Sequence, residues 1–334
     1  MLSRVADSIY WLNRYVERAE NIARFIDVNF NLLLDCPTVI QEQWEPLVVT
    51  TGDQAIFYNQ YGQATGENVV HFLTFDRTYP SSILSCLFAA RENARSVREV
   101  ISSEMWEQVN SIYFMVQESA QGGIQSMAKL REFFDSVKMA SHLFAGVMDA
   151  TMSHNEGWYF GQIGRLLERA DKTARILDVK YFILLPCPQD VGTPLDEVQW
   201  MALLKSASAY EMYRKRRDHR ITISGVVEFL VLDSEFPRSI RYCLLRIEKA
   251  LHQITGTPLG TWRNPVERAL GRLRSDLEYL TLEDIIQTGL HEFLDRLQLQ
   301  MNEVDHQMFD VFFRLDLPTP HSLSLLQATD ALSY

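Results

Sequence analysis

The sequence predicts an all-α protein: a duplicated multi-helix bundle of two pseudo-symmetric units, with about five helices each. Three observations lead to this prediction. A charged segment occurs twice, a second pair of matched blocks follows at nearly the same spacing, and long stretches keep the apolar period of an amphipathic helix.

The repeat is visible in two blocks. RYVERAENIARFIDVN begins at Arg14 and RLLERADKTARILDVK at Arg165, an offset of 151 residues with eight of sixteen positions identical. VVHFLTFDRTYPSSILSCL begins at Val69 and VVEFLVLDSEFPRSIRYCL at Val226, an offset of 157 with ten of nineteen identical. Solenoid repeats are much shorter, about 20–50 residues. We therefore divide the chain into a first helical unit (1–152), a second helical unit (153–314) and a C-terminal tail (315–334).

The helices follow from apolar spacing. From Val5 to Leu33, apolar or small residues alternate steps of four and three, which predicts a helix over 4–34. The second copy keeps this seam, and further long helices are expected over 122–150 and 282–313. VVHFLTFD and VVEFLVLD are locally rich in β-formers but short, so we interpret them as buried connectors.

Composition limits the function. The 334 residues carry a net charge of −11, so a basic face for nucleic acid is not expected. The chain has no apolar run near the ~20 residues of a membrane helix, and its first residues carry charges inside their apolar stretch. We expect a cytoplasmic protein with neither membrane nor nucleic acid as partner.

The repeated charged segments are the first candidate site. Their polar residues lie three or four apart beside the apolar seam, and most of the charges occur in both copies. Three interpretations stay open: ion pairs on a solvated face, buried pairs that fix the register of the fold, or a ligand site. We expect the two helices to pack together, with their Glu-Arg dipeptides buried and cross-paired. The candidate residues are Arg14, Glu17, Arg18 and Arg24 in the first copy and Arg165, Glu168, Arg169 and Arg175 in the second.

A second polar cluster occurs in the first copy only. It lies in ARENARSVRE and comprises Arg91, Glu92, Asn93 and Arg95, where the second copy reads RIEKALHQI. Such asymmetry indicates either a specialised site or one exposed helix face. The basic run from Arg214 to Arg220 is likewise either an anion contact or a solvated helix end.

No motif names a reaction. The chain lacks the phosphate-binding glycine loops and the nucleophile elbow, and none of its four cysteines forms a CxxC pair. One Glu-x-x-His pair, Glu303 with His306, falls short of a di-iron bundle, which needs two such pairs. We expect no cofactor and no metal in this chain.

Four segments resemble the Alpha-E family, helical bacterial proteins named for a Glu-Arg motif. They are YWLNRYVERAEN, AARENARSVREVIS, EGWYFGQIGRLLERADKTARILDVKY and FPRSI, and the resemblance covers Met1 to about residue 255. The family's Glu-Arg signature corresponds here to Glu17-Arg18 and Glu168-Arg169.

The resemblance implies a partnership. Alpha-E proteins are encoded beside, or fused to, a circularly permuted ATP-grasp protein, and transglutaminase-like peptidases are frequent neighbours. It therefore implies a component of an ATP-grasp-linked amide-ligase or peptide-modification system, acting as partner subunit or second-step catalyst. ATP and magnesium would bind to the ATP-grasp partner. Whether this chain is itself catalytic stays open. A structural adaptor without a small-molecule site and an independent carboxylate-metal enzyme are the alternatives.

Overall fold

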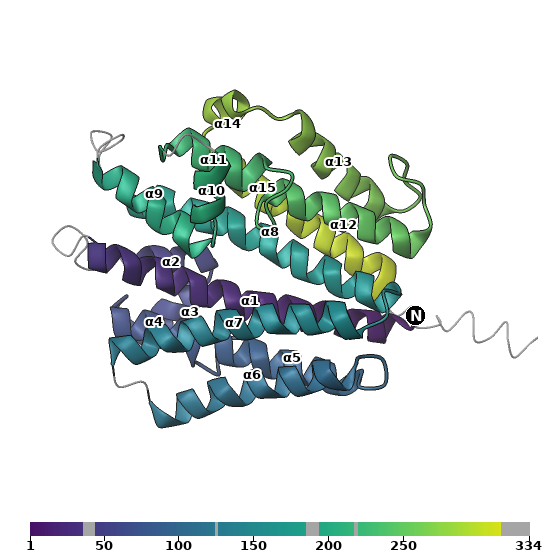
Figure 1. Cartoon of the computed structure of the whole chain (residues 1–334), viewed down its shortest axis with the longest axis horizontal. Helices are drawn as coiled ribbons and strands as arrows, with labels where there is room; N and C mark the ends of the chain where they lie inside the picture. The colour runs from purple at the N-terminus through teal and green to yellow at the C-terminus, as the bar shows by residue number, and fades with distance from the viewer. Residues whose placement is uncertain (36–43, 124–125, 185–193, 217–219, 315–334) are drawn as a thin grey trace, which may run out of the picture.

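The computed structural model describes residues 1–35, 44–123, 126–184, 194–216 and 220–314, and these residues form an all-α fold with no strand among them (Figure 1). Residues 1–152 contain α1 (Ser3–Asp35), α2 (Glu45–Thr51), α3 (Gln54–Tyr61), α4 (Gly66–Thr74), α5 (Ile83–Ser96), α6 (Ser103–Gly122) and α7 (Met127–Thr151). Residues 153–314 contain α8 (Glu156–Leu184), α9 (Pro194–Ser206), α10 (Tyr210–Arg216), α11 (Ile223–Leu232), α12 (Ile240–Thr255), α13 (Pro265–Tyr279), α14 (Leu282–Thr288), α15 (Leu290–Met308) and a π-helical turn, η2 (Phe309–Phe313).

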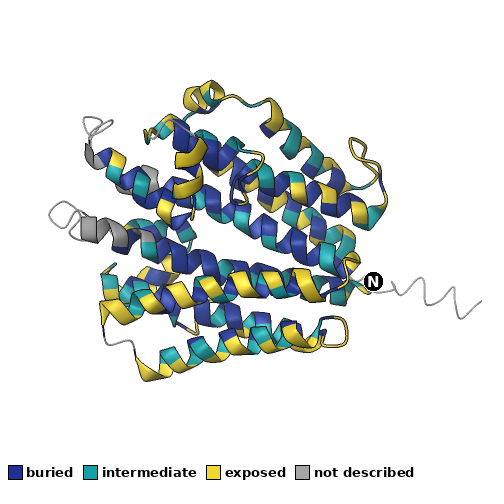
Figure 2. Ribbon diagram, in the orientation of Figure 1, coloured by how far each residue is buried: buried dark blue, intermediate teal, exposed yellow. Residues whose placement is uncertain are grey.

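Helices α1 and α8 form the central pair and run side by side in the same direction (Figure 1). On one side, α1 packs on α5 and α7, with α6 against both of them. On the other side, α8 packs on α12 and α15, with α13 against both. Figure 2 shows α1 and α8 buried along much of their length, whereas α6 and α7 expose an outer face. The apolar seam of the first helix is thus a core seam, including Ile9, Leu12 and Ile26.

Two short helices cross between the sets. Helix α9 packs on α1 as well as on α8, and α2 packs on α8. The division into two repeated units stays a prediction, which a superposition of residues 1–152 on 153–314 would test. The predicted tail, 315–334, lies outside the described residues.

The interpretation of VVHFLTFD and VVEFLVLD as connectors is wrong, because both fall largely within helices, α4 and α11. Threonine side chains cap these helices: Thr65 accepts a hydrogen bond from the Asn68 backbone N–H, and Thr222 from that of Gly225. An N-cap bond satisfies one of the open donors of the first turn. With most of their apolar residues buried, capping and packing override local β-propensity.

The predicted helix over 282–313 is divided. It forms α14, α15 and η2, and the first break falls at Gly289, whose φ of 93° lies in the left-handed region. Glycine adopts this region without steric cost, so the chain turns there. By contrast, the helix predicted over 4–34 is confirmed as Ser3–Asp35.

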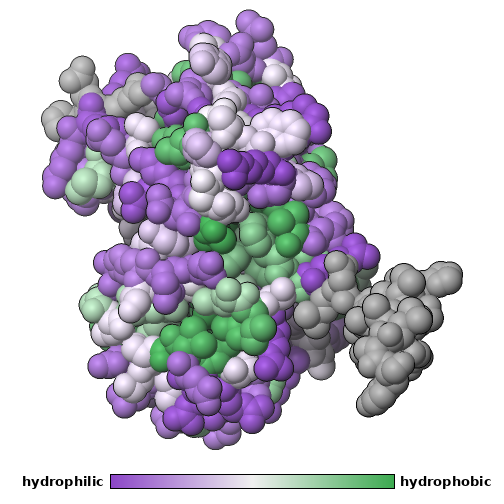
Figure 3. Space-filling model, turned by 90° about the vertical axis from the view of Figure 1, so that its right-hand side faces the viewer, coloured by the Kyte–Doolittle hydropathy of each residue, from purple (hydrophilic) through white to green (hydrophobic). Residues whose placement is uncertain are grey.

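The end of the bundle at which α1 and α8 begin carries apolar patches among hydrophilic residues (Figure 3). Met1 and Leu2 are exposed there, and so are Phe309 and Val311 of η2, which packs against α1. Phe313 of η2 also contacts the ring of Tyr10, with centroids 5.2 Å apart. None of the helices among the described residues is long and apolar enough to cross a bilayer.

Candidate functional site

Glycines on α8 allow the central helices to approach closely. A Cβ at Gly164 would lie 2.4 Å from the backbone oxygen of Tyr10, and one at Gly161 would lie 2.7 Å from Nδ2 of Asn13. Real Cβ atoms do not make such short contacts, so neither position accepts a side chain without movement. The close approach near the start of both helices sets the spacing at which the next turns meet.

One and two turns further on, the two Glu-Arg dipeptides pair across the interface. Glu17 Oε1 accepts from Arg169 Nε at 2.9 Å and Oε2 from Arg169 Nη2 at 2.7 Å. Glu168 Oε1 accepts from Arg18 Nε at 2.7 Å and Oε2 from Arg18 Nη2 at 3.0 Å. Each glutamate thus binds the other helix's arginine in the bidentate geometry that gives strong, oriented pairs. The predicted cross-pairing is confirmed.

The carboxylates are deeply buried and ionised. Glu17 is 1% exposed and Glu168 is 0% exposed, while the two arginines are partly buried. Burial raises the pKa of Glu168, but Arg18, Lys172 and Arg14 outweigh it and hold the pKa well below its usual range. The pKa of Glu17 is also lowered: burial raises it, Arg169 lowers it, and the carboxylate of Glu20 opposes Arg169. Both glutamates are therefore ionised near neutral pH, and neither is a proton donor there.

Each of the two glutamates also lies near a further cationic side chain, and the two cations come from different parts of the fold. On the α1 side, Arg238, at the turn before α12, contacts Glu17 Oε1 at 3.4 Å and also pairs with Glu20. On the α8 side, Lys172 lies 3.5 Å from Glu168 Oε1 and 2.8 Å from Asp171 Oδ2. Sequence reasoning missed Arg238. The available signal was an arginine in FPRSI where the first copy has Ser81.

The next turn of each helix caps a helix of the opposite set. Arg24 binds Glu20 and donates to the backbone oxygen of Ser206 at 2.9 Å, at the end of α9. Arg175 binds Asp171 and donates to the backbone oxygen of Thr50 at 2.8 Å, near the end of α2. Cations at helix C-termini satisfy open carbonyls and complement the helix dipole.

The first arginine of each copy behaves differently. Arg14 binds Glu168 at 2.9 Å and Asp305 of α15 at 2.5 Å. Arg165 donates to Gln162 at 2.6 Å, and its buried Nε has no hydrogen-bond partner among the described residues. Burial and the neighbouring Arg169 lower the pKa of Arg165. The eight candidate residues of the two repeated segments therefore lie along one interface.

The cluster on α5 does not join that interface. Arg91 donates to Asn110 Oδ1 of α6 at 2.7 Å, Glu92 pairs with Arg95 at 2.5 Å, and Asn93 donates to a backbone oxygen of its own helix. Ala90 and Ala94, on the opposite face of α5, are buried, and this face arrangement directs the charges outward. Four of the twelve candidate residues are therefore separate from the other eight.

The remaining candidates show no catalytic arrangement. Burial raises the pKa of the Cys86 and Cys243 thiols to about 12, so neither is a thiolate at neutral pH. In the basic run, the guanidinium of Arg214 lies over the Tyr210 ring and Arg216 pairs with Asp233, while residues 217–219 lie outside the described part. Within the described residues, no group of three or more His, Cys, Asp or Glu side chains could hold a metal ion.

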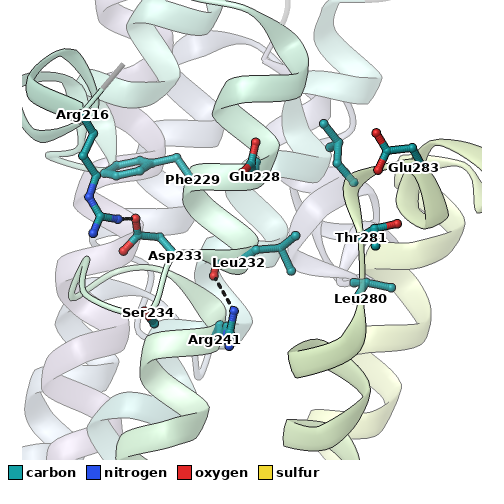
Figure 4. A pocket seen from close by; sticks show the side chains of 11 residues that line it. Arg216, Glu228, Phe229, Leu232, Asp233, Ser234, Arg241, Leu280, Thr281 and Glu283 are labelled. Atoms are coloured by element: carbon teal, nitrogen blue, oxygen red, sulfur yellow. Dashed lines mark hydrogen bonds and ion pairs between the residues drawn. The ribbon is translucent and has the colours of Figure 1, made fainter. Parts of the chain in front are cut away.

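Three described cavities lie away from the central interface. The largest, of about 920 Å³, lies between α11, α12 and the start of α14 (Figure 4). Two smaller ones, of about 400 and 390 Å³, flank α13 and share Trp262, Arg268 and Arg272. None of the twelve candidate residues lines any of the three.

The geometry defines an all-α protein whose central helices are joined by two reciprocal Glu-Arg pairs. Residues 1–313 match the model of the Alpha-E family, described as a predicted alpha-helical domain with a conserved ER motif. The chain belongs to the Alpha-E family. A further Glu-Arg dipeptide, Glu267-Arg268, lies at the start of α13, where Glu267 accepts from the Arg263 backbone N–H at 2.6 Å.

The curated relatives are longer than this chain. An uncharacterized protein of Mycobacterium bovis is 24% identical over 98% of this chain and 38% of its own length. An uncharacterized protein of Mycobacterium tuberculosis strain H37Rv is 23% identical over the same shares. The chain thus spans less than half the length of the curated relatives it matches. No solved structure gives a significant match.

Proposed function

We propose that this chain is the helical partner subunit of an ATP-grasp enzyme, in a cytoplasmic system that forms or modifies amide bonds. In this proposal the ATP-grasp protein holds ATP and magnesium and activates a carboxylate. The chain described here binds that enzyme and supports the reaction. A transglutaminase-like peptidase is a second candidate partner.

The observation that supports this proposal is the greater length of the curated relatives. In the mycobacterial proteins, the region that matches this chain is 38% of a longer polypeptide. Regions of one polypeptide commonly bind one another, so we expect the region that this chain represents to bind the protein that corresponds to the remainder of those relatives. Membership of the Alpha-E family, with its association to ATP-grasp proteins, indicates what that partner is.

The closed central interface argues against chemistry at the Glu-Arg pairs. Every carboxylate oxygen of Glu17 and Glu168 accepts at least one hydrogen bond from an arginine. A substrate would have to displace these bonds from a site with almost no exposed surface. The pairs therefore support a role in fixing helix register, and a second-step catalytic role would need another site.

The same observation favours the second candidate function, a structural adaptor without a small-molecule site. The two functions differ in what they do to an enzyme. An active partner subunit changes the rate of ATP turnover, whereas an adaptor binds without changing it.

Co-expression with a circularly permuted ATP-grasp protein from the same genome tests the proposal. We expect the two chains to co-elute in size-exclusion chromatography and the complex to hydrolyse ATP faster with an amine and a carboxylate substrate. Charge reversal at candidate contacts, Arg91→Glu and Arg214→Glu, should weaken the complex, and Arg246→Glu on α12 serves as a control. Failure to co-elute, together with unchanged ATP hydrolysis, would refute the proposal, and co-elution without a rate change would favour the adaptor.

A further inference from the structure

The largest of the three described cavities is lined by charged side chains of both signs, with apolar side chains between them. Figure 4 shows Arg241 toward one end of the cleft and the carboxylates of Glu228 and Glu283 toward the other. Leu232 and Leu280 lie between these ends. A volume of about 920 Å³ lies within the ~300–1,000 Å³ usual for small-molecule sites.

Arg241 has unused hydrogen-bonding capacity. A guanidinium carries five N–H donors. Among the described residues, Arg241 makes one long bond, from Nη1 to the backbone oxygen of Leu232 at 3.5 Å, and its buried Nε has no partner. The nearby Asp233 is already neutralised, because it pairs with Arg216 and caps the turn by accepting from the Glu235 and Phe236 backbone N–H groups. A carboxylate in the cleft would accept from the guanidinium N–H groups with which Arg241 lines it.

The opposite end is suited to a cation. Glu283, in the first turn of α14, is exposed and makes no side-chain hydrogen bond or ion pair among the described residues. Glu228 of α11 adds a second carboxylate on the same side of the cleft. An ammonium group is a natural partner for the carboxylate of Glu283, with Glu228 on the same side of the cleft.

The matched region of the first copy lacks these features. Arg241 aligns with Leu84, which is only 3% exposed, and Glu228 aligns with His71. Leu232 aligns with Phe75, whose ring packs on Phe133 of α7 with centroids 5.4 Å apart. The helix pair therefore does not require an arginine at position 241.

We propose that the cleft between α11, α12 and α14 binds a short peptide by its two charged ends. The carboxylate end lies at Arg241, the amine end lies at Glu283 and Glu228, and the apolar middle lies against Leu232 and Leu280. This inference deepens the proposed function and rests on it, since it names the substrate class of an amide-forming system.

Titration calorimetry with three peptides tests the cleft. The probes are trialanine, its N-acetylated form, which lacks the amine charge, and its C-terminal amide, which lacks the carboxylate. We expect trialanine to bind with a Kd on the order of 1 mM or tighter. Each blocked form should bind roughly 10-fold or more weakly, since a hydrogen bond to a charged group is lost.

Two variants locate the binding. Arg241→Leu introduces the residue of the matched first-copy position and should weaken trialanine binding at least about 10-fold, with no further loss on amidation. Glu283→Gln should reduce the effect of N-acetylation. Arg246→Leu, on the same helix but outside the cleft, should bind like the wild type, and circular dichroism checks that each variant is folded.

Several outcomes would overturn the inference: no trialanine binding to the folded protein, equal binding of the blocked forms, or unchanged binding by Arg241→Leu. These outcomes are distinct from failure of the proposed function. Arg241→Leu should still co-elute with the ATP-grasp protein. If the wild-type chain forms the complex but does not bind trialanine, only the cleft inference is refuted. Peptide binding by a chain that forms no complex with the ATP-grasp protein would refute only the proposed function.

Discussion

The two sides of the central interface hold the same Glu-Arg pair and complete it differently. On the α1 side, position 21 is a neutral asparagine and the extra cation is Arg238, which comes from the turn before α12. On the α8 side, the matched position is Lys172, which supplies a cation in addition to Arg14, and the residue matched to Arg238 is Ser81.

This difference separates the geometry of the Glu-Arg pair, which is the same on both sides, from the source of the additional positive charge, which differs. A buried carboxylate needs compensating positive charge, because an unpaired ion in a low-dielectric interior is costly. The bidentate arginine occurs on both sides, whereas the additional cation differs in residue type and in origin. The geometry of the pair is therefore fixed by the helices, and the remaining charge is balanced by whichever neighbouring position provides a cation.

Acid should affect both sides, in a defined order. The folded-state pKa values of Glu17, Glu20 and Glu168 are lowered, so their stabilisation is present above the unfolded pKa of about 4.3 and is lost as the pH falls through the folded values. We expect the free energy of unfolding to fall steeply below about pH 4.3. Glu17 should protonate before Glu168, because Glu20 lies beside it. Carboxyl carbon NMR titration measures the order, and earlier protonation of Glu168 would contradict it.

Removing either central carboxylate should be among the most destabilising single substitutions in this protein. Glu17→Ala leaves Arg169 without its bidentate partner and removes one of the contacts of Arg238. Glu168→Ala leaves Arg18 without its partner and removes one contact each of Arg14 and Lys172. We expect each to lower the free energy of unfolding by about 3–5 kcal/mol in urea denaturation. The control Glu132→Ala, on the exposed face of α7, should stay within about 0.5 kcal/mol. A loss under about 1 kcal/mol for both central variants would show that the pairs do not hold the helices.

Exchanging the extra cation should test whether the two arrangements are equivalent. Arg238→Ser removes the cation of the α1 side, and we expect a loss of about 3 kcal/mol. Adding Asn21→Lys places a lysine at the position that matches Lys172. This second change should recover at least about 1 kcal/mol of the free energy of unfolding. The lysine alone should destabilise, since it crowds Arg238. Strict additivity of the two single changes in urea denaturation would mean that the sides are not interchangeable.

Substitution of a glycine at which the two central helices approach closely should have the smallest effect on stability. Gly164→Ala places a methyl group against the Tyr10 backbone and should cost about 1–3 kcal/mol. Gly146→Ala, inside α7 with nothing within 4 Å of the added carbon, should instead stabilise by about 0.4–1 kcal/mol. Thermal unfolding of both variants measures the contrast, and equal effects would show that close packing at Gly164 is unimportant.

Sequence patterns predict the central helices well because both signals are local. The apolar seam from Val5 to Leu33 predicts the position of α1, and the repeat of Glu17-Arg18 at Glu168-Arg169 predicts their pairing. The helices α4 and α11 are not predictable in this way, because their β-formers become helical only through capping and burial. The split at Gly289 depends on a single backbone conformation.

The candidate site is only partly predictable. Periodicity places Arg91 and Arg95 on a helix, but only the packing of Ala90 and Ala94 shows that they face away from the centre. Arg238 is visible in the alignment of the two copies, but its partners lie more than 200 residues away in the sequence. The cleft at Arg241 arises where α11, α12 and α14 meet, and no local pattern contains all three.

The reciprocal pairs also set an order of events during synthesis. Glu17 and Arg169 are 152 residues apart, and a ribosome adds about 5–20 residues per second, so roughly 8–30 s separate the carboxylate from its arginine. During that interval, the stripe of α1 that will be buried against α8 carries charges that favour water over other apolar surfaces. We expect these charges to disfavour premature closure and aggregation of the nascent first half. Its centre is completed only when α8 has left the ribosome.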